Sequence, residues 1–236
     1  MGKKSSFKKI IILVTILALP GFLYYLLQEK GKNRYRPLDI YGPKQVAMTF
    51  HTKRGEKIPD TIYHQIRDFK LLSSTGDSIG IPTDSNQIVV VNFFFTNCKS
   101  FCPEMNSQMA RVVAEYPNNK MLQFYSISVD PKHDTPGILQ AYSEKLKADP
   151  KRWHFLTGSR DFIFELAKRD FLVDAFVDSA DTANIIHSSM LILIDRDKRI
   201  RGYYDSASKD QINKLIDEIK VQITEELREA TSLSKK

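Results

Sequence analysis

One nine-residue run, dominated by β-branched and aromatic residues, constrains the fold more than any other segment. The run Ile88–Thr96 reads I-V-V-V-N-F-F-F-T. A run of this length and composition is typical of a central strand that is buried on both faces. Such strands occur in sheets that are covered by helices on both sides. We therefore expect an α/β fold with this strand near the middle of the sheet.

The two cysteines of the chain, Cys98 and Cys102, follow this run directly. A helical pattern begins near Glu104, so both thiols are expected at the carboxyl end of a strand and near the start of a helix. Ligands of open α/β sheets bind at that edge, and a helix N-terminus favours thiolate. The pair can close a disulfide or bind a metal ion. The alternative, two small buried apolar residues, fits this position less well.

The pattern after residue 60 predicts a single α/β domain. Strands are expected at 69–72, 88–96, 122–129, 153–157, 190–194 and 200–204. Helices are expected from Glu104 onward, at 135–146, at 161–168 and at 212–223, and residues 170–184 form an irregular acidic stretch. We expect a mixed sheet with helices on both faces. The methionines of the first helix, Met105 and Met109, have helical spacing and are expected in the core.

Charge is distributed unevenly along the chain. Residues 1–36 contain eight lysines and arginines and one acidic residue, so this segment carries the whole net charge of +7. The remaining residues contain 27 basic and 27 acidic side chains. A neutral domain lacks the positive surface that dominates affinity for nucleic acids, so we expect no nucleic-acid partner.

Residues 10–27 form an uncharged apolar stretch that is long enough for a membrane-spanning helix. The alternative, a cleaved signal peptide, lacks a small-residue cleavage site. The predicted organisation is a basic start at 1–9, a transmembrane anchor at 10–27, a tether at 28–60, an α/β domain at 61–225 and a polar tail at 226–236. The tether is expected because three prolines lie among charged residues without an apolar period.

Five motifs between residues 63 and 223 carry a family resemblance. They are Phe93–Pro103, Ser126–Pro136, Phe155–Gly158, His187–Ser188 and Leu193–Asp195. In this order they resemble the Sco/SenC family of membrane-anchored, thioredoxin-like copper chaperones, which serve assembly of the dinuclear copper centre of cytochrome c oxidase.

The resemblance implies copper ligands at Cys98, Cys102 and His187. Soft thiolates select Cu(I), and an added imidazole nitrogen makes a site that also suits Cu(II). The implied partner is the copper-centre subunit of cytochrome c oxidase or another copper-handling protein. The implied location is a bacterial inner membrane, with one span and the domain facing the periplasm or the outside. A mitochondrial inner membrane is less favoured, because no presequence precedes the span.

Two other functions use the same cysteines. A thioredoxin-like thiol-disulfide oxidoreductase would use Cys98 and Cys102 as its redox pair, so whether the chain is an enzyme stays open. Thioredoxins place a proline before the strand that corresponds to 190–194, where this chain has His187-Ser188-Ser189. A peroxiredoxin would need a threonine where this chain has Lys99.

Several polar residues near these motifs have ordinary structural explanations. Asp130 and Asp134 could be catalytic carboxylates, but the neighbouring prolines favour roles in a turn and a helix cap. Asp174, Asp178 and Asp181 form an acidic loop that either attracts copper or a cationic partner or serves solubility. Histidines outside the motif positions are expected to be structural or solvated; they are His51, His64, His133 and His154.

Overall fold

The computed structural model describes residues 3–30, 37–53, 55–81, 87–173, 176–177, 185–186 and 189–233. These divide into two compact units, residues 1–36 and 37–236, which we describe separately.

The first unit consists of helix α1, Lys3–Lys30. Its described apolar side chains are exposed around the whole helix, from Ile12 (58%) and Leu17 (71%) to Phe22 (58%). α1 includes the whole predicted span, residues 10–27, which is therefore helical throughout. Within this span, the side chains of Ile10, Ile11, Leu26 and Leu27 are not among those described. Among the described residues, no helix combines the length and apolar character needed to cross a membrane.

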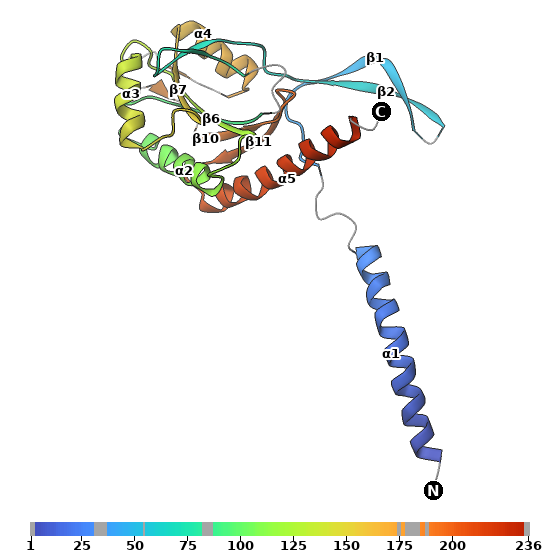
Figure 1. Cartoon of the computed structure of the whole chain (residues 1–236). Helices are drawn as coiled ribbons and strands as arrows, with labels where there is room; N and C mark the ends of the chain where they lie inside the picture. The colour runs from blue at the N-terminus through green and yellow to red at the C-terminus, as the bar shows by residue number, and fades with distance from the viewer. Residues whose placement is uncertain are drawn as a thin grey trace. The chain divides into compact units, whose positions relative to one another are not determined.

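The second unit is built on a seven-stranded mixed sheet in the order β11-β10-β5-β6-β7-β3-β4 (Figure 1). The strands, in chain order, are β3 (Leu71–Ser73), β4 (Ser78–Ile79), β5 (Ile88–Phe94), β6 (Leu122–Ser128), β7 (Trp153–Thr157), β10 (Met190–Ile194) and β11 (Ile200–Asp205). β5, β6 and β7 are parallel, whereas β10 and β11 at one side and β3 and β4 at the other are antiparallel. The predicted mixed sheet is confirmed.

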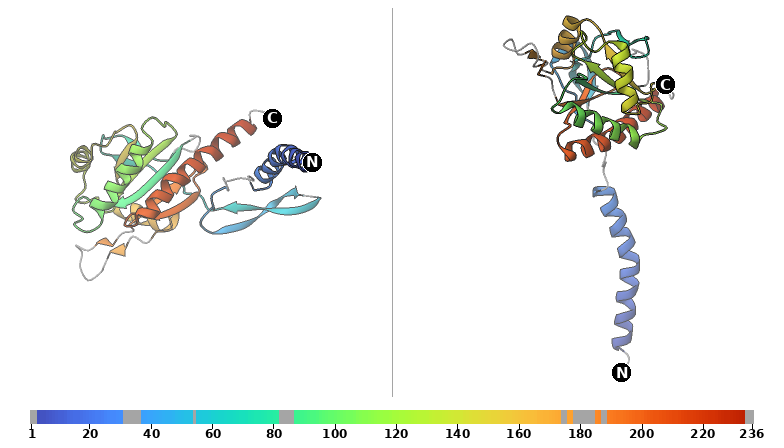
Figure 2. Two further views of the ribbon diagram at one scale, coloured as in Figure 1. Left: turned by 90° about the horizontal axis from the view of Figure 1, so that it is seen from below. Right: turned by 90° about the vertical axis from the view of Figure 1, so that its left-hand side faces the viewer.

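Helices cover both faces of this sheet. α2 (Cys102–Glu115), α3 (Pro136–Lys145) and α5 (Lys209–Leu233) contribute to the core on one face, and α2 and α5 lie side by side (Figure 2). α4 (Arg160–Glu165) and the single π-helical turn η1 (Leu166–Asp170) contribute to the core on the other face. All seven residues of β5 are buried, as expected for a central strand covered on both faces.

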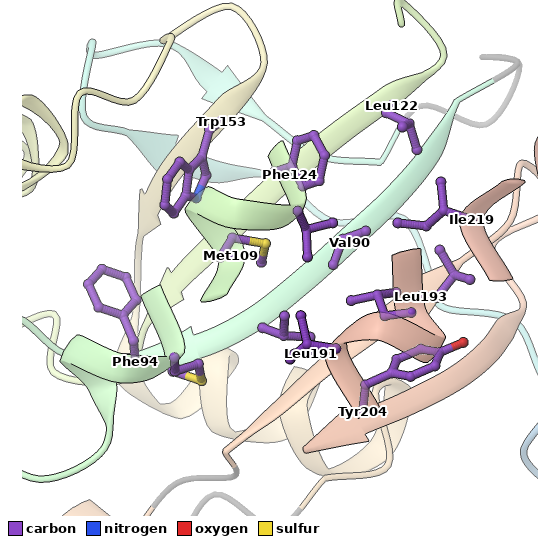
Figure 3. Packing of buried hydrophobic residues seen from close by; sticks show 14 of the residues in the cluster. Val90, Phe94, Met109, Leu122, Phe124, Trp153, Leu191, Leu193, Tyr204 and Ile219 are labelled. Carbon is purple, nitrogen blue, oxygen red and sulfur yellow. The ribbon is translucent and has the colours of Figure 1, made fainter. Parts of the chain in front are cut away.

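The core beneath α2 and α5 is formed by alternate residues of the strands. Val90 and Phe94 of β5 and Leu191 and Leu193 of β10 point toward this layer, where they meet Met109 of α2 (Figure 3). Met105 and Met109 are fully buried, which confirms their predicted place in the core.

Two segments differ from expectation. Residues 44–60 of the predicted tether, together with the first three residues of the predicted domain, form an antiparallel hairpin of β1 (Lys44–Lys53) and β2 (Glu56–Tyr63). The alternation of Val46, Met48 and Phe50 has the period of a strand, and this signal was missed. A shorter strand, β8 (Phe176–Val177), lies in the stretch that was predicted to be irregular, and it pairs with β9 (Ile185–Ile186), which follows that stretch.

A further difference is at the C-terminus, where α5 continues to Leu233 through most of the predicted polar tail. Arginines from the β10–β11 turn and from β11 anchor the end of this helix. Arg196 lies 2.8 Å from Glu226, and Arg201 lies 2.8 Å from Glu225. The helix therefore continues into the polar segment because its glutamates pair with arginines of the domain. A hydrophobic period in the sequence cannot indicate such pairs.

Replacement of Leu193 by Ala is expected to lower the free energy of unfolding by about 2–5 kcal/mol, because it leaves a cavity in the core. Leu193 is fully buried in that core. Leu227→Ala is the matched control, since Leu227 is 55% exposed, and its effect should stay within about 0.5 kcal/mol. Denaturant unfolding followed by the fluorescence of Trp153, which is buried, measures both. Equal losses would contradict this account of the core.

Candidate metal and redox site

The loop between β5 and α2 holds both thiols, as the sequence predicted. Cys98 is 7% exposed and Cys102 is 1% exposed, and neither is in a disulfide. α2 begins at Cys102, two residues earlier than expected, with Pro103 in its first turn. Proline is favoured there because its missing N–H would have no partner in the helix. Cys102 therefore lies in the first helical turn, and Cys98 lies in the loop that leads to it.

The environments of the two thiols differ. Burial raises the pKa of Cys98, but hydrogen bonds from Cys102 and Ser100 stabilise its thiolate and bring the pKa below its ordinary value overall. The Oγ of Ser100 lies 3.4 Å from the Sγ of Cys98. Burial raises the pKa of Cys102 far above its usual range, and the hydrogen bond with Cys98 and the negative charges at Cys98 and Asp134 raise it further. Cys98 is thus the thiol of the pair that loses its proton more easily, and Cys102 is the thiol that keeps its proton.

Asp134 holds the start of the cysteine loop. Its carboxylate is fully buried and accepts hydrogen bonds from the backbone N–H of Thr96 (3.0 Å), the hydroxyl of Thr96 and the hydroxyl of Ser128. Thr96 follows β5, and Ser128 ends β6. The carboxylate therefore ties together the ends of two neighbouring parallel strands.

The predicted role of Asp134 as a helix cap was wrong. The N-cap residue of α3 is Thr135, and no side-chain hydrogen bond caps this end of the helix. The predicted turn at Asp130 is confirmed, since its carbonyl accepts hydrogen bonds from the N–H groups of His133 (3.1 Å) and Asp134 (2.8 Å). A sequence motif shows that Asp134 follows a strand, but it does not show that a buried carboxylate needs the hydroxyl of Thr96 as a partner.

A chain of buried polar side chains lies on the same face of the sheet as the cysteines. Asn92 of β5 donates from Nδ2 to Oδ1 of Asn106 on α2 (2.9 Å), and Asn106 donates to the hydroxyl of Tyr142 on α3 (3.0 Å). Burial raises the pKa of Tyr142, and negative charge at the two cysteines and Asp134 raises it further, whereas the bond from Asn106 lowers it. No sequence signal marked Ser100, Asn106 or Tyr142 beyond their nearness to the cysteines or their helical position.

The remaining predicted site residues have different outcomes. His187 and the acidic residues Asp174, Asp178 and Asp181 lie outside the described residues. The four histidines that were expected to be structural each contact a polar group of the protein; the partners are Asp60 for His51, the carbonyl of Asp170 for His64, Asp134 for His133 and Gln123 for His154. Within the described ranges, no group of three or more His, Cys, Asp or Glu residues could hold a metal ion.

The register of the sheet shows which later segment approaches the cysteine loop. β10 pairs with β5 in antiparallel register, with Ile192 opposite Val91 and Ile194 opposite Val89. The first residue of β10, Met190, therefore lies toward the end of β5 from which the cysteine loop departs.

Comparisons with known proteins agree with this architecture. The SCO1/SenC family model matches residues 60–224. A solved SCO1/SenC family lipoprotein from Bacillus anthracis str. Ames is 28% identical, with a TM-score of 0.62 over 68% of this chain and 95% of that chain. The thioredoxin-like α/β fold predicted from the motifs is therefore confirmed.

Two further relatives extend the comparison. One is BsSco, a member of the Sco family of cytochrome c oxidase assembly proteins in which a disulfide switch is described. BsSco is 25% identical, with a TM-score of 0.60 over 68% of this chain and 94% of that chain. A protein of Stutzerimonas stutzeri with the name "Putative copper-binding protein" is 29% identical over 65% of this chain and 76% of its own length.

Alkylation should discriminate between the two thiols. With limiting iodoacetamide under reducing conditions, Cys98 should be modified at least several-fold faster than Cys102, because thiolate is the nucleophile and Cys98 is also the more exposed. Peptide mass spectrometry after a time course measures both rates in one sample. In denaturant the two rates should converge. Equal rates in the folded protein would show that the thiols are not distinguished as described.

Proposed function

The chain belongs to the SCO1/SenC family, and from this premise we propose that it is a membrane-anchored copper-binding chaperone. Its cargo would be delivered to the copper-centre subunit of cytochrome c oxidase or to another copper-handling protein. The role of BsSco as a cytochrome c oxidase assembly protein and the copper-binding name of the Stutzerimonas relative support this proposal.

The observation that carries the proposal is the arrangement of Cys98 and Cys102. Neither thiol is in a disulfide, the two share a hydrogen bond, and the short segment from Cys98 to Cys102, the first residue of α2, follows the carboxyl end of a central strand. Two adjacent thiolates are soft ligands of the kind that selects Cu(I). The donor set therefore fits copper as cargo better than it fits a hard cation such as magnesium.

His187 is the proposed third ligand. The family motif places a histidine at this position, and an imidazole added to two thiolates extends the site to Cu(II). The antiparallel pairing of β10 with β5 supports the assignment, because residue 187 is three positions before Met190, which lies toward the cysteine end of β5.

Protons govern the loading of this site. Metal-bound cysteines are thiolates, so the proton that Cys102 holds, because of its raised pKa, must leave when copper binds. Copper affinity should consequently fall as pH falls, since protons compete with the metal for sulfur. Ser100 and the positioned loop favour the thiolate at Cys98, where binding would begin.

A second function is favoured by the difference between the two thiols. In a thiol-disulfide oxidoreductase, the Cys98 thiolate would attack a partner's disulfide and form a mixed disulfide, with release of one partner thiolate. Cys102 would then displace the second partner sulfur and close a Cys98–Cys102 disulfide. The disulfide switch described for BsSco supports this chemistry in a relative.

The proposed location is a bacterial cytoplasmic membrane, with the Sco domain on its outer side. The uncharged stretch of residues 10–27 and the exposed apolar side chains all round α1 support an anchor, because such a helix has no polar face to present to water. The name of the Bacillus anthracis relative, a lipoprotein, describes a membrane-attached protein of the same family.

Copper titration tests the site. Cys98→Ala and Cys102→Ala should each abolish stoichiometric Cu(I) binding by the reduced, detergent-solubilised chain, because a single thiolate cannot provide the two-sulfur site. His187→Ala should retain Cu(I) binding and lose the thiolate-to-Cu(II) charge-transfer band. His51→Ala is the control, since His51 lies on the β1–β2 hairpin and pairs with Asp60. Competition with a Cu(I) chelator and absorption spectroscopy measure the two oxidation states.

Two results would separate the candidate functions. Tight Cu(I) binding by either cysteine variant would overturn the metal-site assignment. No tight binding by the unaltered chain, together with a Cys98–Cys102 disulfide that cycles readily with a thiol reductant, would favour the oxidoreductase.

Alkaline carbonate extraction tests the anchor. The full chain, expressed in a bacterium, should stay in the membrane pellet, whereas a variant without residues 1–36 should appear in the supernatant, because the apolar helix is gone. Cys98→Ala in the full chain is the control and should stay in the pellet. Extraction of the full chain would contradict the transmembrane proposal.

A further inference from the structure

The β1–β2 hairpin stands apart from the main sheet. Its two strands pair with each other and not with any strand of the seven-stranded sheet, and their contacts lie almost entirely within the pair. The hairpin extends away from the body of the domain (Figure 1). A lone two-stranded hairpin is marginally stable in water unless a further surface covers it.

One face of the hairpin is apolar and exposed. Alternate residues of a strand share a face, and Val46 lies opposite Thr61 and Phe50 opposite Pro59, so the face stays continuous across the irregular pairing between them. The exposed fractions on this face are 77% for Val46, 97% for Met48 and 61% for Phe50.

The opposite face carries the acidic groups. Nδ1 of His51 lies 2.7 Å from Oδ1 of Asp60, and Glu56 pairs with Lys53, two residues along the strand from His51 and therefore on the same side. Ile62, opposite Gln45, belongs to this side as well and is 54% exposed. Among the described residues of the hairpin, both carboxylates thus lie away from the apolar face.

The apolar face is bounded by lysines. Lys44 pairs with Tyr63, and its Nζ lies 5.6 Å from the centre of the Tyr63 ring. Lys57 pairs with Thr52 at the other end of the hairpin. An apolar centre with an aromatic residue and lysines at its borders matches the boundary between acyl chains and anionic headgroups, because lysine stems can lie along apolar surface while the ammonium groups reach the headgroups.

We propose that the apolar face of the β1–β2 hairpin lies on an anionic lipid surface, with Val46, Met48 and Phe50 in the interface. The inference rests on the proposed anchor for its location. Lys44 is seventeen positions after Leu27, the end of the predicted span, so the chain keeps the start of the hairpin within about 60 Å of that membrane. A lysine-bounded face without carboxylates favours anionic lipid over an interface with a second copy, whose identical lysines would face each other.

Tryptophan quenching tests the orientation. Phe50→Trp and Ile62→Trp place a reporter on opposite faces of the hairpin, and the natural Trp153 is 2% exposed in the core and gives a constant background. The full chain is incorporated into vesicles of phosphatidylcholine with phosphatidylglycerol that carry a brominated acyl chain. We expect quenching of F50W to exceed that of I62W at least twofold. K44E together with K57E should lower the F50W quenching toward the I62W level.

The experiment distinguishes failure of the hairpin proposal from failure of the anchor proposal. Each vesicle sample is also extracted with carbonate after the quenching measurement. If F50W is quenched but carbonate then releases the chain from the vesicles, the anchor proposal is overturned and the hairpin contact is supported. Equal quenching of F50W and I62W, or quenching that does not depend on phosphatidylglycerol, overturns the proposal. A blue shift of F50W emission that grows with protein concentration in detergent, without quenching in vesicles, assigns the face to a second copy and overturns it as well.

Discussion

The buried carboxylate of Asp134 is the interaction on which the geometry of the site depends. A fully buried charge is costly unless hydrogen bonds satisfy it, and here Thr96 and Ser128 supply them. The same bonds fix the end of β5 next to the end of β6. The cysteine loop starts at that fixed point, so the positions of Cys98 and Cys102 follow from a polar interaction beneath them as much as from the apolar core.

Burial, to which this negative charge adds, separates the chemistry of the two thiols. Cys102, which is deeper and near Asp134, keeps its proton, whereas Cys98, with hydrogen bonds from Ser100 and Cys102, loses its proton more easily. A pair of this kind can accept a soft metal ion with release of a proton, and it can also begin thiol exchange from one defined sulfur. The two proposed functions, copper binding and thiol-disulfide exchange, therefore rest on the same pair of thiols.

The central architecture could be predicted from the sequence, because the strands carry their own signal. β7 and β10 have the predicted bounds, and β5, β6 and β11 differ from prediction by at most two residues. What the sequence could not show depends on partners distant in the chain. α5 extends to Leu233 because Arg196 and Arg201 pair with its glutamates. Asp134 holds the cysteine loop only because the fold brings Thr96 within hydrogen-bond distance of it. The hairpin was missed for another reason, since the charged residues and prolines concealed a clear alternation at Val46, Met48 and Phe50.

The sheet order has a consequence for the newly made protein. β5 lies between β6 and β10, yet β10 is made about a hundred residues after β5, and α5, which packs beside α2, comes last. Until ribosomes have added this C-terminal part, one edge of β5 is unpaired and the helix that carries Cys102 lacks its neighbour. Long-range pairing of this kind forms slowly. The packing that buries Cys102 is therefore complete only after the C-terminal part of the chain has been made.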